Sequence, residues 1–369
     1  MTLREQSHTS KQKVTQNYWL TIFHLVKPQL SKLLLKTLIV ACIYAVTAKL
    51  SLEFATLPGK VTAVWFPSGL TFAFVTWFGL RALPGIALGS ISFMVWNSLT
   101  MPLSWPVSSD IVAIVACSLA NSLQPVIGVG IIHRLTHSPP SLDHMKTVIS
   151  FVVAATIAPM LPAFIGITTS ALVGIVPWSS YGISWFAWWS AGMAAILVFT
   201  PTLLFWPQAD VSVRSQVYKE VIGILGTTLS LCWLIFGQGY PVEYMLLLVL
   251  IWSGLRLGSF MASALVSLIA VIAIVSTAHG FGVFTESSIT HSLVILQSFI
   301  AVCSVSSLVL GGALKAQKAV ELSLGKTLLS LEQQVSDRTT QLRESQAILD
   351  GFFSVAPVGL GIVDRDLRY

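Results

Sequence analysis

The chain has 369 residues, of which 54% are hydrophobic and only 10% are charged, and its mean hydropathy is +0.80. Soluble domains carry about 25% charged residues, so this composition excludes an ordinary globular enzyme, a disordered chain and a nucleic-acid-binding domain. The formal net charge of +6 is distributed in a way that fits membrane topology better than nucleic-acid binding. We therefore predict an all-α polytopic membrane protein whose main partner is the lipid bilayer.

The polarity of the chain changes sharply near Lys315. Residues 1–33 are polar and basic, and 34–315 hold the apolar segments of a predicted integral membrane domain. Residues 316–352 are charge-rich and predict a linker helix. The stretch 353–369 turns apolar again and has the pattern of two short strands, which are marginal alone. We therefore expect the chain to end inside a truncated α+β domain.

About ten helical spans are predicted, each near the 20 residues that cross about 30 Å of hydrocarbon. In chain order they are 34–53, 61–79, 82–99, 108–132, 147–175, 181–205, 219–238, 240–256, 259–278 and 289–314. The eighth is short, and the second and third are joined tightly. Pro84, Pro159, Pro162 and Pro201 lie inside or at the ends of spans, so bent helices are expected.

The basic residues provide an independent test of these spans. With the N-terminus in the cytoplasm, the outside loops hold Lys60 as their one basic residue. The inside segments hold Arg4, Lys11, Lys13, Lys27, Lys32, Lys36, Arg81, Arg134, Lys146, Arg214, Lys219, Arg256, Lys315 and Lys318. Lys and Arg concentrate on the cytoplasmic side of membrane proteins. An even number of spans then places both termini in the cytoplasm.

The linker 316–352 carries an apolar seam at alternating steps of three and four residues. Its members are Leu324, Leu328, Leu331, Val335, Leu342, Leu349 and Phe352. Arg338 and Ser345 occupy the two polar steps, which suits a helix that must shift rather than a permanent zipper. The heptad pattern favours a parallel homodimeric coiled coil. A single amphipathic helix packed on its own chain is the alternative.

The sequence shows no catalytic motif. It contains no nucleotide-binding loop, zinc-protease helix, nucleophile elbow or kinase motif, so we predict no catalytic residue and no cofactor. The four cysteines lie inside apolar runs and form no disulfide framework. His133, His137 and His144 lie near one loop, where solvation beside Pro139 and Pro140 is favoured over metal binding. We predict no metal site.

Ionisable residues inside a membrane usually mark function, and this chain has few. Lys49 and Glu53 are four residues apart near the outer end of the first span and are placed to pair. Asp110, Glu243 and Arg256 lie at span ends, where snorkelling or solvation is the favoured explanation. The scarcity of such groups argues against an ion-driven secondary transporter, which stays an alternative function.

The remaining candidates for signal sensing or helix packing are aromatic, polar, proline, small and span-end residues. They are Trp65, Pro67, Gly69, Gly89, Asn121, Gln124, Trp188, Trp189, Pro201, Arg256, Gly258 and Gln297. The tryptophans either line a ligand cavity or form an interfacial belt, the commoner arrangement. The amides are expected to link helices, Gly85 with Gly89 to form a packing face, and Pro67 to kink its span.

The order and spacing of these segments resemble the membrane-associated sensor domain of bacterial signalling proteins, the first of the MASE types, over roughly residues 35–315. The segments that carry the resemblance are 65–70, 79–81, 84–89, 121–124, 188–189, 200–201, 251–258 and 296–299. Gln124 stands where the family usually has an acid, and the acid usual near Gly192 is missing. These two departures argue against charge-based sensing in this chain.

The C-terminal part extends the resemblance. Residues 331–342 resemble the linker helix common in sensor histidine kinases, and 356–364 resemble the opening of a PAS domain. The resemblance implies an inner-membrane sensory input region, with a histidine kinase of a phosphorelay as the leading output and downstream PAS and output domains as partners. A diguanylate cyclase or phosphodiesterase is the next output. A secondary transporter or a structural membrane scaffold are alternatives from other classes.

Overall fold

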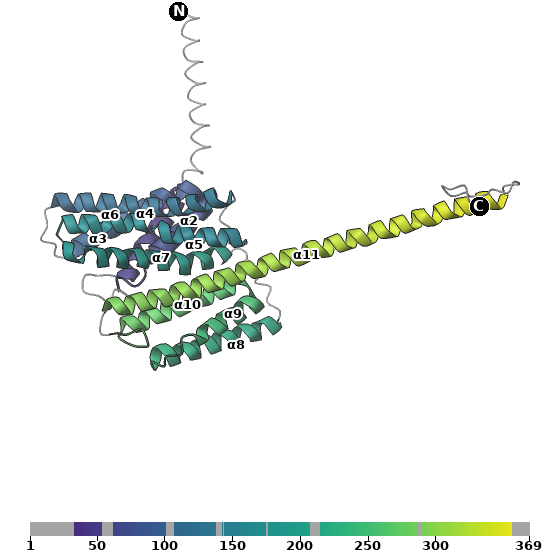
Figure 1. Cartoon of the computed structure of the whole chain (residues 1–369). Coiled ribbons are helices and arrows are strands. Elements are labelled where there is room, and N and C mark those ends of the chain that lie inside the picture. Colours follow the sequence, from purple (N-terminus) through teal and green to yellow (C-terminus); the bar gives the residue numbers. More distant parts are fainter. Residues whose placement is uncertain are drawn as a thin grey trace, which may run out of the picture. The chain divides into compact units, whose positions relative to one another are not determined.

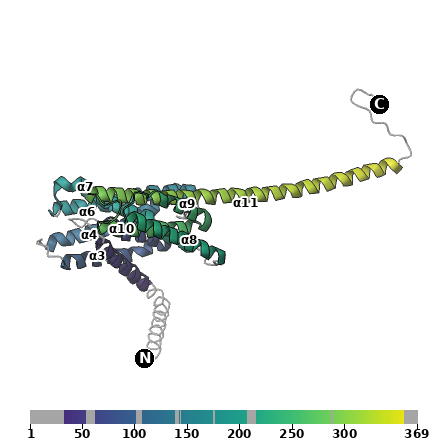
Figure 2. The same cartoon turned by 90° about the horizontal axis from the view of Figure 1, so that it is seen from below.

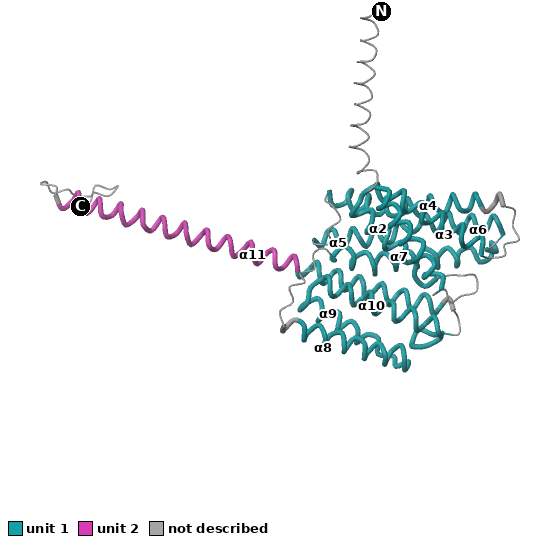
Figure 3. The backbone as a smooth tube through the Cα atoms, turned by 180° about the vertical axis from the view of Figure 1, so that it is seen from behind, with its two compact units in different colours: residues 1–314 teal, residues 315–369 magenta. Residues whose placement is uncertain are grey.

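The computed structural model describes residues 33–53, 62–100, 107–137, 142, 144–174, 176–206, 215–286 and 289–355, and every regular element in them is helical (Figure 1). The chain forms two compact units, residues 1–314 and 315–369 (Figure 3). The predicted basic segment 1–33, apart from Leu33, and the predicted PAS-like strands after residue 355 lie outside the described residues.

The helices agree closely with the predicted spans in most places. In chain order they are the N-terminal helix (Leu33–Glu53), α2 (Phe66–Phe78), α3 (Leu83–Thr100), α4 (Val107–Thr136), α5 (Met145–Ile157), α6 (Met160–Leu172), α7 (Tyr181–Phe205), α8 (Ser215–Cys232), α9 (Met245–Leu257), α10 (Ser259–Ala278) and α11 (Ile289–Val355). A 3₁₀ turn (Gly79–Ala82) joins α2 to α3, another (Trp178–Ser180) precedes α7, and a π-helical segment (Trp233–Gly237) extends α8.

Eight helical runs among the described residues are long and apolar enough to cross a membrane, whereas about ten were predicted. The first difference is α9, which has 13 residues. Its rise of about 20 Å is less than the hydrocarbon thickness, but the ion pair between Arg256 and Glu220 places its end beside the start of α8, so α9 reverses the chain as the predicted span does. The second difference is that α2, the 3₁₀ turn and α3 form one uninterrupted helical run, Phe66–Thr100.

That run nevertheless reverses direction at the 3₁₀ turn. The ring of Trp65, just before α2, lies 5.7 Å from the ring of Phe93, in the second half of α3. The start of α2 therefore lies beside the later part of α3. Gly79 permits the reversal because its φ of +61° is a conformation that glycine adopts at little cost. The two predicted spans in this run are thus separate, antiparallel helices.

The two glycines of the expected packing face on α3 lie against the N-terminal helix. A Cβ atom on Gly85 would lie 2.8 Å from the Cβ of Val40, and one on Gly89 would lie 2.7 Å from the Cβ of Tyr44. Both glycines therefore let the backbone of α3 approach the N-terminal helix closely. Close approach of small residues is how helices associate in lipid, where burial of apolar side chains gives little driving force.

The predicted span 147–175 forms two helices, α5 and α6, because the helix is interrupted at Pro159. Proline has no N–H group, and its ring clashes with the carbonyl of the residue four positions earlier, here Ala155. Pro125 inside α4 and Pro201 inside α7 disturb their helices in the same way without ending them. Bent helices were expected at both Pro159 and Pro201. The helix ends at Pro159, whereas α7 continues through Pro201.

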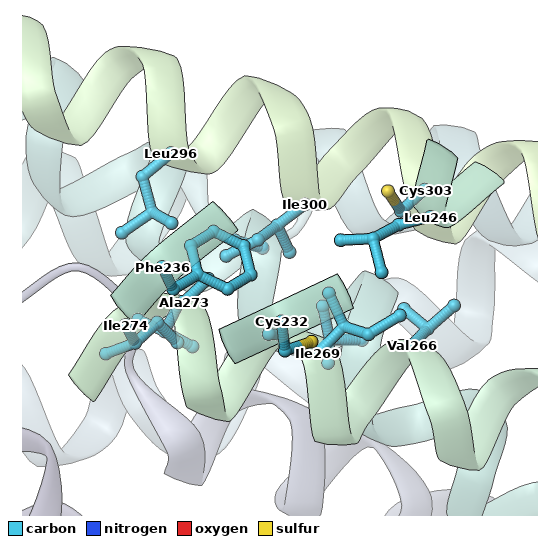
Figure 4. Close-up of a cluster of buried hydrophobic side chains, with 14 of the residues drawn as sticks. Cys232, Phe236, Leu246, Val266, Ile269, Ala273, Ile274, Leu296, Ile300 and Cys303 are labelled. Carbon is cyan, nitrogen blue, oxygen red and sulfur yellow. The ribbon is translucent and has the colours of Figure 1, made fainter. Parts of the chain in front are cut away.

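The bundle of unit 1 has three clusters of buried apolar side chains. The largest lies between α7, α8, α9, α10 and the first part of α11, with Phe236, Ile269 and Ile300 among its members (Figure 4). The second joins α2, α4, α5 and α7, and the third joins the N-terminal helix to α2 and α3. Helix α7 contributes to two clusters, and Figures 1 and 2 show it within the bundle.

Helix α11 is a single helix of 67 residues that runs through Lys315 and past the predicted linker end at residue 352. Its first part is buried in unit 1, where Leu296, Ile300 and Cys303 belong to the largest cluster. In unit 2 the six apolar seam residues from Leu324 to Leu349 are between 52% and 64% exposed. The seam therefore has no apolar partner within the part of the chain that the structure describes.

Candidate functional site

A non-helical segment, residues 62–65, leads into α2; its first three residues are buried and Trp65 is half-buried. The predicted span began at residue 61, but the helix begins only at Phe66. Pro67 lies in the first turn, where a missing N–H group costs nothing, so it starts α2 rather than kinking it as expected. Non-helical backbone at membrane depth occurs only where it is buried in protein or lines a cavity, and most of this segment is buried.

Two neighbouring helices hold the exit of this segment. The N–H group of Trp65 donates to the carbonyl of Ala191 in α7, with an N–O distance of 3.2 Å. The N–H group of Phe66 donates to Oγ of Ser51 in the N-terminal helix, at 3.0 Å. The backbone N–H groups of the two residues at the helix start are thus bonded to neighbouring helices.

A third helix holds the start of the segment. Nε2 of Gln297 in α11 donates to the carbonyl of Ala63 at 2.8 Å, and both partners are buried. The two residues are 234 positions apart in the sequence. This bond joins the membrane-embedded part of α11 directly to the non-helical segment. Gln297 thus links two elements of the bundle.

A small cavity lies beside the segment, with room for about one water molecule. Eight residues from α2, α4, α6 and α7 and their flanks line this polar cavity. They are Trp65, Ser68, Asn121, Gln124, Pro159, Pro162, Trp188 and Gly192. None of these described lining residues is charged. Four candidate residues that the sequence analysis selected for separate reasons therefore line the same cavity. They are Trp65, Asn121, Gln124 and Trp188.

The polar cavity lies where α2 begins, where α5 ends and α6 starts, and where a proline disturbs α4. Pro125 follows Gln124 near the middle of α4, Pro159 separates α5 from α6, and α2 begins at Phe66. Proline at 125 has no N–H group to donate to the carbonyl of Asn121. Where a helix is interrupted, polar backbone groups no longer bond within the helix and can face a cavity. Transporter binding sites use broken helices in the same way.

Gln124 is the central polar group of the cavity. Its Oε1 accepts a hydrogen bond from Oγ of Ser68 in α2 at 3.2 Å, and the residue is 2% exposed. Its Nε2 has no hydrogen-bond partner among the described residues. A buried donor without a partner costs about 1–3 kcal/mol. Nearby, Nδ2 of Asn121 donates to Oγ of Ser90 in α3 at 3.2 Å, so both amides link helices as expected.

Helices α2 and α7 approach each other closely near this site. A Cβ atom on Gly69 would clash with the carbonyl oxygen of Ala195. Oγ1 of Thr200 donates to the carbonyl of Gly69 at 2.8 Å, and this bond is buried. Pro201 follows Thr200 in α7 but does not line the polar cavity. The residues 69 and 200 are thus packing positions whose contact fixes α2 against α7.

The candidate tryptophans contact neighbouring helices. Nε1 of Trp189 donates to the carbonyl of Thr156 in α5 at 2.7 Å. The ring of Trp188 lies 3.0 Å from where a Cβ on Gly166 would stand, so it packs on α6. Trp178 is 60% exposed and fits the interfacial belt. Trp188 therefore lines a cavity, and Trp189 is bonded to α5.

The other candidates lie away from the polar cavity. Arg256, at the end of α9, forms an ion pair with Glu220 near the start of α8. Gly258 ends α9 with a φ of +85°. The predicted pair between Lys49 and Glu53 is present at 2.8 Å. No group of three His, Cys, Asp or Glu residues suited to a metal ion occurs among the described residues.

Sequence reasoning missed Ser68, Pro159, Pro162 and Gly192 as cavity residues, and it missed Glu220 as the partner of Arg256. Pro159 and Pro162 were identified only as causes of bending, and Gly192 only as a position near a missing acid. The available signal was a proline inside the span of α4 together with the two prolines, Pro159 and Pro162, near the middle of the predicted span 147–175. Their position at one depth becomes visible only once the helices are packed.

Residues 35–318 match the family model described as MASE1. No curated protein and no solved structure gives a match. MASE1 is a membrane sensor domain found in histidine kinases and diguanylate cyclases. With its apolar helices and a family match over more than half of its length, this multi-pass membrane chain belongs to the MASE1 family of membrane-associated sensor domains.

Proposed function

We propose that this chain is the sensory input region of a bacterial sensor histidine kinase that acts in a phosphorelay from the inner membrane. Both termini are cytoplasmic, in accordance with the one-sided distribution of Lys and Arg. The resemblance of residues 331–342 to the linker helix of such kinases supports a kinase output. A diguanylate cyclase or phosphodiesterase output is the second candidate, because the MASE1 domain occurs with diguanylate cyclases too.

The observation that carries this proposal is the buried hydrogen bond between Gln297 and Ala63. It connects the segment beside the polar cavity to α11, which continues without a break through Lys315 to Val355. A signal that favours one of two packings of the bundle would shift their populations by its difference in affinity. Helices can transmit such a change by small translations or rotations. Helix α11 is therefore the proposed output element.

The exposed seam of unit 2 supports a second copy of the chain as the partner of α11. Its apolar side chains repeat at the spacing that two parallel helices bury against each other. The two polar steps, Arg338 and Ser345, weaken the pairing and leave room for a change of register. The proposed signal-relaying state is a parallel homodimer with PAS and output domains downstream.

The transporter alternative has less support. Transport coupled to ions uses ionisable groups near the middle of the membrane, and the described residues that line the polar cavity carry no charge. Lys49 and Glu53 pair with each other at the end of the N-terminal helix. A structural scaffold would not need the Gln297 bond between α11 and the segment beside the cavity.

Replacing Gln297 by methionine tests the proposed relay. Gln297→Met keeps the length of the side chain but leaves the buried carbonyl of Ala63 without its partner, a change of about 1–3 kcal/mol. In the full-length signalling protein, reconstituted in membrane vesicles, we expect kinase autophosphorylation to change about tenfold, since 1.4 kcal/mol corresponds to a factor of ten. If autophosphorylation does not occur in any variant, diguanylate cyclase activity is the second readout.

Gln317→Met is the matched control because Gln317 lies in the same helix but is exposed, and its Nε2 donates to Oε1 of Glu321 on the helix surface, at 2.9 Å. Pairs of this kind on helix surfaces contribute a few tenths of a kcal/mol, so output should stay within about twofold. An output of Gln297→Met equal to that of Gln317→Met, with the variant folded and inserted, would contradict the relay.

A further inference from the structure

We propose that the polar cavity is a binding site for a small neutral molecule that carries a hydrogen-bond acceptor. Its occupation would be the signal that the bundle reads, and this second step rests on the proposed sensory function. The binding step stands on four observations of its own. They are the donor of Gln124, the uncharged lining, the size of the cavity and the tryptophans that form its walls.

The acceptor follows from Gln124. The amide oxygen is already bonded to Ser68, which fixes the side chain and leaves Nε2 as the group with no partner. The residue is 98% buried, so bulk water does not satisfy this donor. A guest with a carbonyl or hydroxyl oxygen would supply the missing acceptor. An apolar guest would leave the donor unsatisfied and gain nothing from it.

The neutral charge of the guest follows from the rest of the lining. The described residues around the cavity are tryptophans, prolines, amides, a serine and a glycine, with no Lys, Arg, Asp or Glu among them. The cavity lies near the middle of α4 and of the α5–α6 pair, where a charge without a counter-ion is costly to bury. The N-terminus of α2 at Phe66 adds a weak preference for the acceptor end of the guest.

The size of the cavity limits the guest and explains how it would act. In this structure there is room for about one water molecule, so a larger guest must move a wall. Trp65 forms one wall, and its backbone N–H is bonded to Ala191. The same segment is bonded to Gln297 of α11 through Ala63. A guest that displaces Trp65 therefore moves the segment 62–65, to which α11 is bonded through Gln297.

Formamide is a suitable probe because it is a small neutral carbonyl compound, and formate is its charged counterpart of nearly equal shape. The chain is reconstituted in lipid nanodiscs with 5-fluorotryptophan, and the ¹⁹F resonance of Trp188 is assigned by its loss in Trp188→Phe. We expect formamide to shift this resonance saturably, with a Kd no tighter than about 1 mM for so small a ligand. Formate should leave it in place.

Two variants separate the donor from the volume of the site. Gln124→Met removes the donor at nearly constant size and should weaken formamide binding about fivefold. Gly192→Ala adds a Cβ atom 3.6 Å from Oγ of Ser68 and 3.0 Å from Pro159, which fills the cavity and should weaken binding as well. Gln238→Met is the control, because Gln238 is exposed and does not line the cavity.

The proposal is wrong if formamide gives no saturable shift in the unmodified chain, or if formate binds equally well. It is also wrong if Gln124→Met or Gly192→Ala binds formamide as tightly as Gln238→Met does. Because this readout uses no kinase output, a failure here leaves the test at Gln297 unaffected. A failure at Gln297 likewise leaves the binding result standing, with the signalling role withdrawn.

Discussion

Replacing Gly69 by alanine is expected to lower the free energy of unfolding of the membrane domain by about 3 kcal/mol. The added Cβ would clash with the backbone carbonyl of Ala195, which has no flexible end that can move away. Separating α2 from α7 to relieve the clash also stretches the buried bond from Thr200 to the carbonyl of Gly69. The loss is measured by reversible unfolding of the purified chain in mixed micelles.

Gly130→Ala is the matched control for this experiment. Gly130 lies inside α4, and no atom comes within 4 Å of where its Cβ would stand. Alanine favours the helix over glycine by about 1 kcal/mol, so this variant should be as stable as the parent or more so. Equal stability of the Gly69 and Gly130 variants would show that the approach of α2 to α7 is not close enough to exclude a methyl group.

Inserting one residue after Gly325 is expected to change the output of the full-length protein at least about tenfold, because one residue rotates the rest of the helix by about 100°. The apolar seam beyond the insertion would then face away from its continuation toward the bundle. Gly325 has no atom within 4 Å of its Cβ position, and the side-chain bond that spans the insertion is the local one from Oγ1 of Thr327 to the carbonyl of Ser323. Autophosphorylation in membrane vesicles is the measurement.

A seven-residue insertion at the same place serves as the control. Seven residues restore the seam to within about 20°, so this longer insertion should leave output within about twofold if the phase of the seam is what matters. If the one-residue and seven-residue insertions changed the output equally, the rotation of α11 would not matter for signalling. The proposed relay would then have to be abandoned.

Much of the fold could be predicted from the sequence because apolar runs of this length have few alternatives in a bilayer. The predicted spans 181–205 and 259–278 coincide with α7 and α10 to the residue. The errors occur where local chemistry interrupts a helix. Residues 62–65 were assigned to a helix because they are apolar, although Pro67 favours a helix start just before it.

The candidate site could be predicted only in part. Trp65, Asn121, Gln124 and Trp188 were selected because polar and aromatic side chains inside spans need a reason, and all four line the polar cavity. These four residues come together because of how the helices pack and how far along the membrane normal each residue lies. The sequence of a single span does not contain this information. Glu220 illustrates the limit, since it becomes the partner of Arg256 only when α8 lies beside α9.

The central claim is that α11 carries changes in the bundle into a parallel dimer, and a cysteine cross-linking scan of unit 2 in membranes tests it most directly. Single cysteines are placed in turn along residues 324–335 in a chain whose exposed Cys42 is replaced by serine. If α11 pairs as a parallel dimer, cross-links between copies should be strong at Leu328, Leu331 and Val335 and weak at Lys326 and Gln333. Uniform or absent cross-linking along the scan would contradict it.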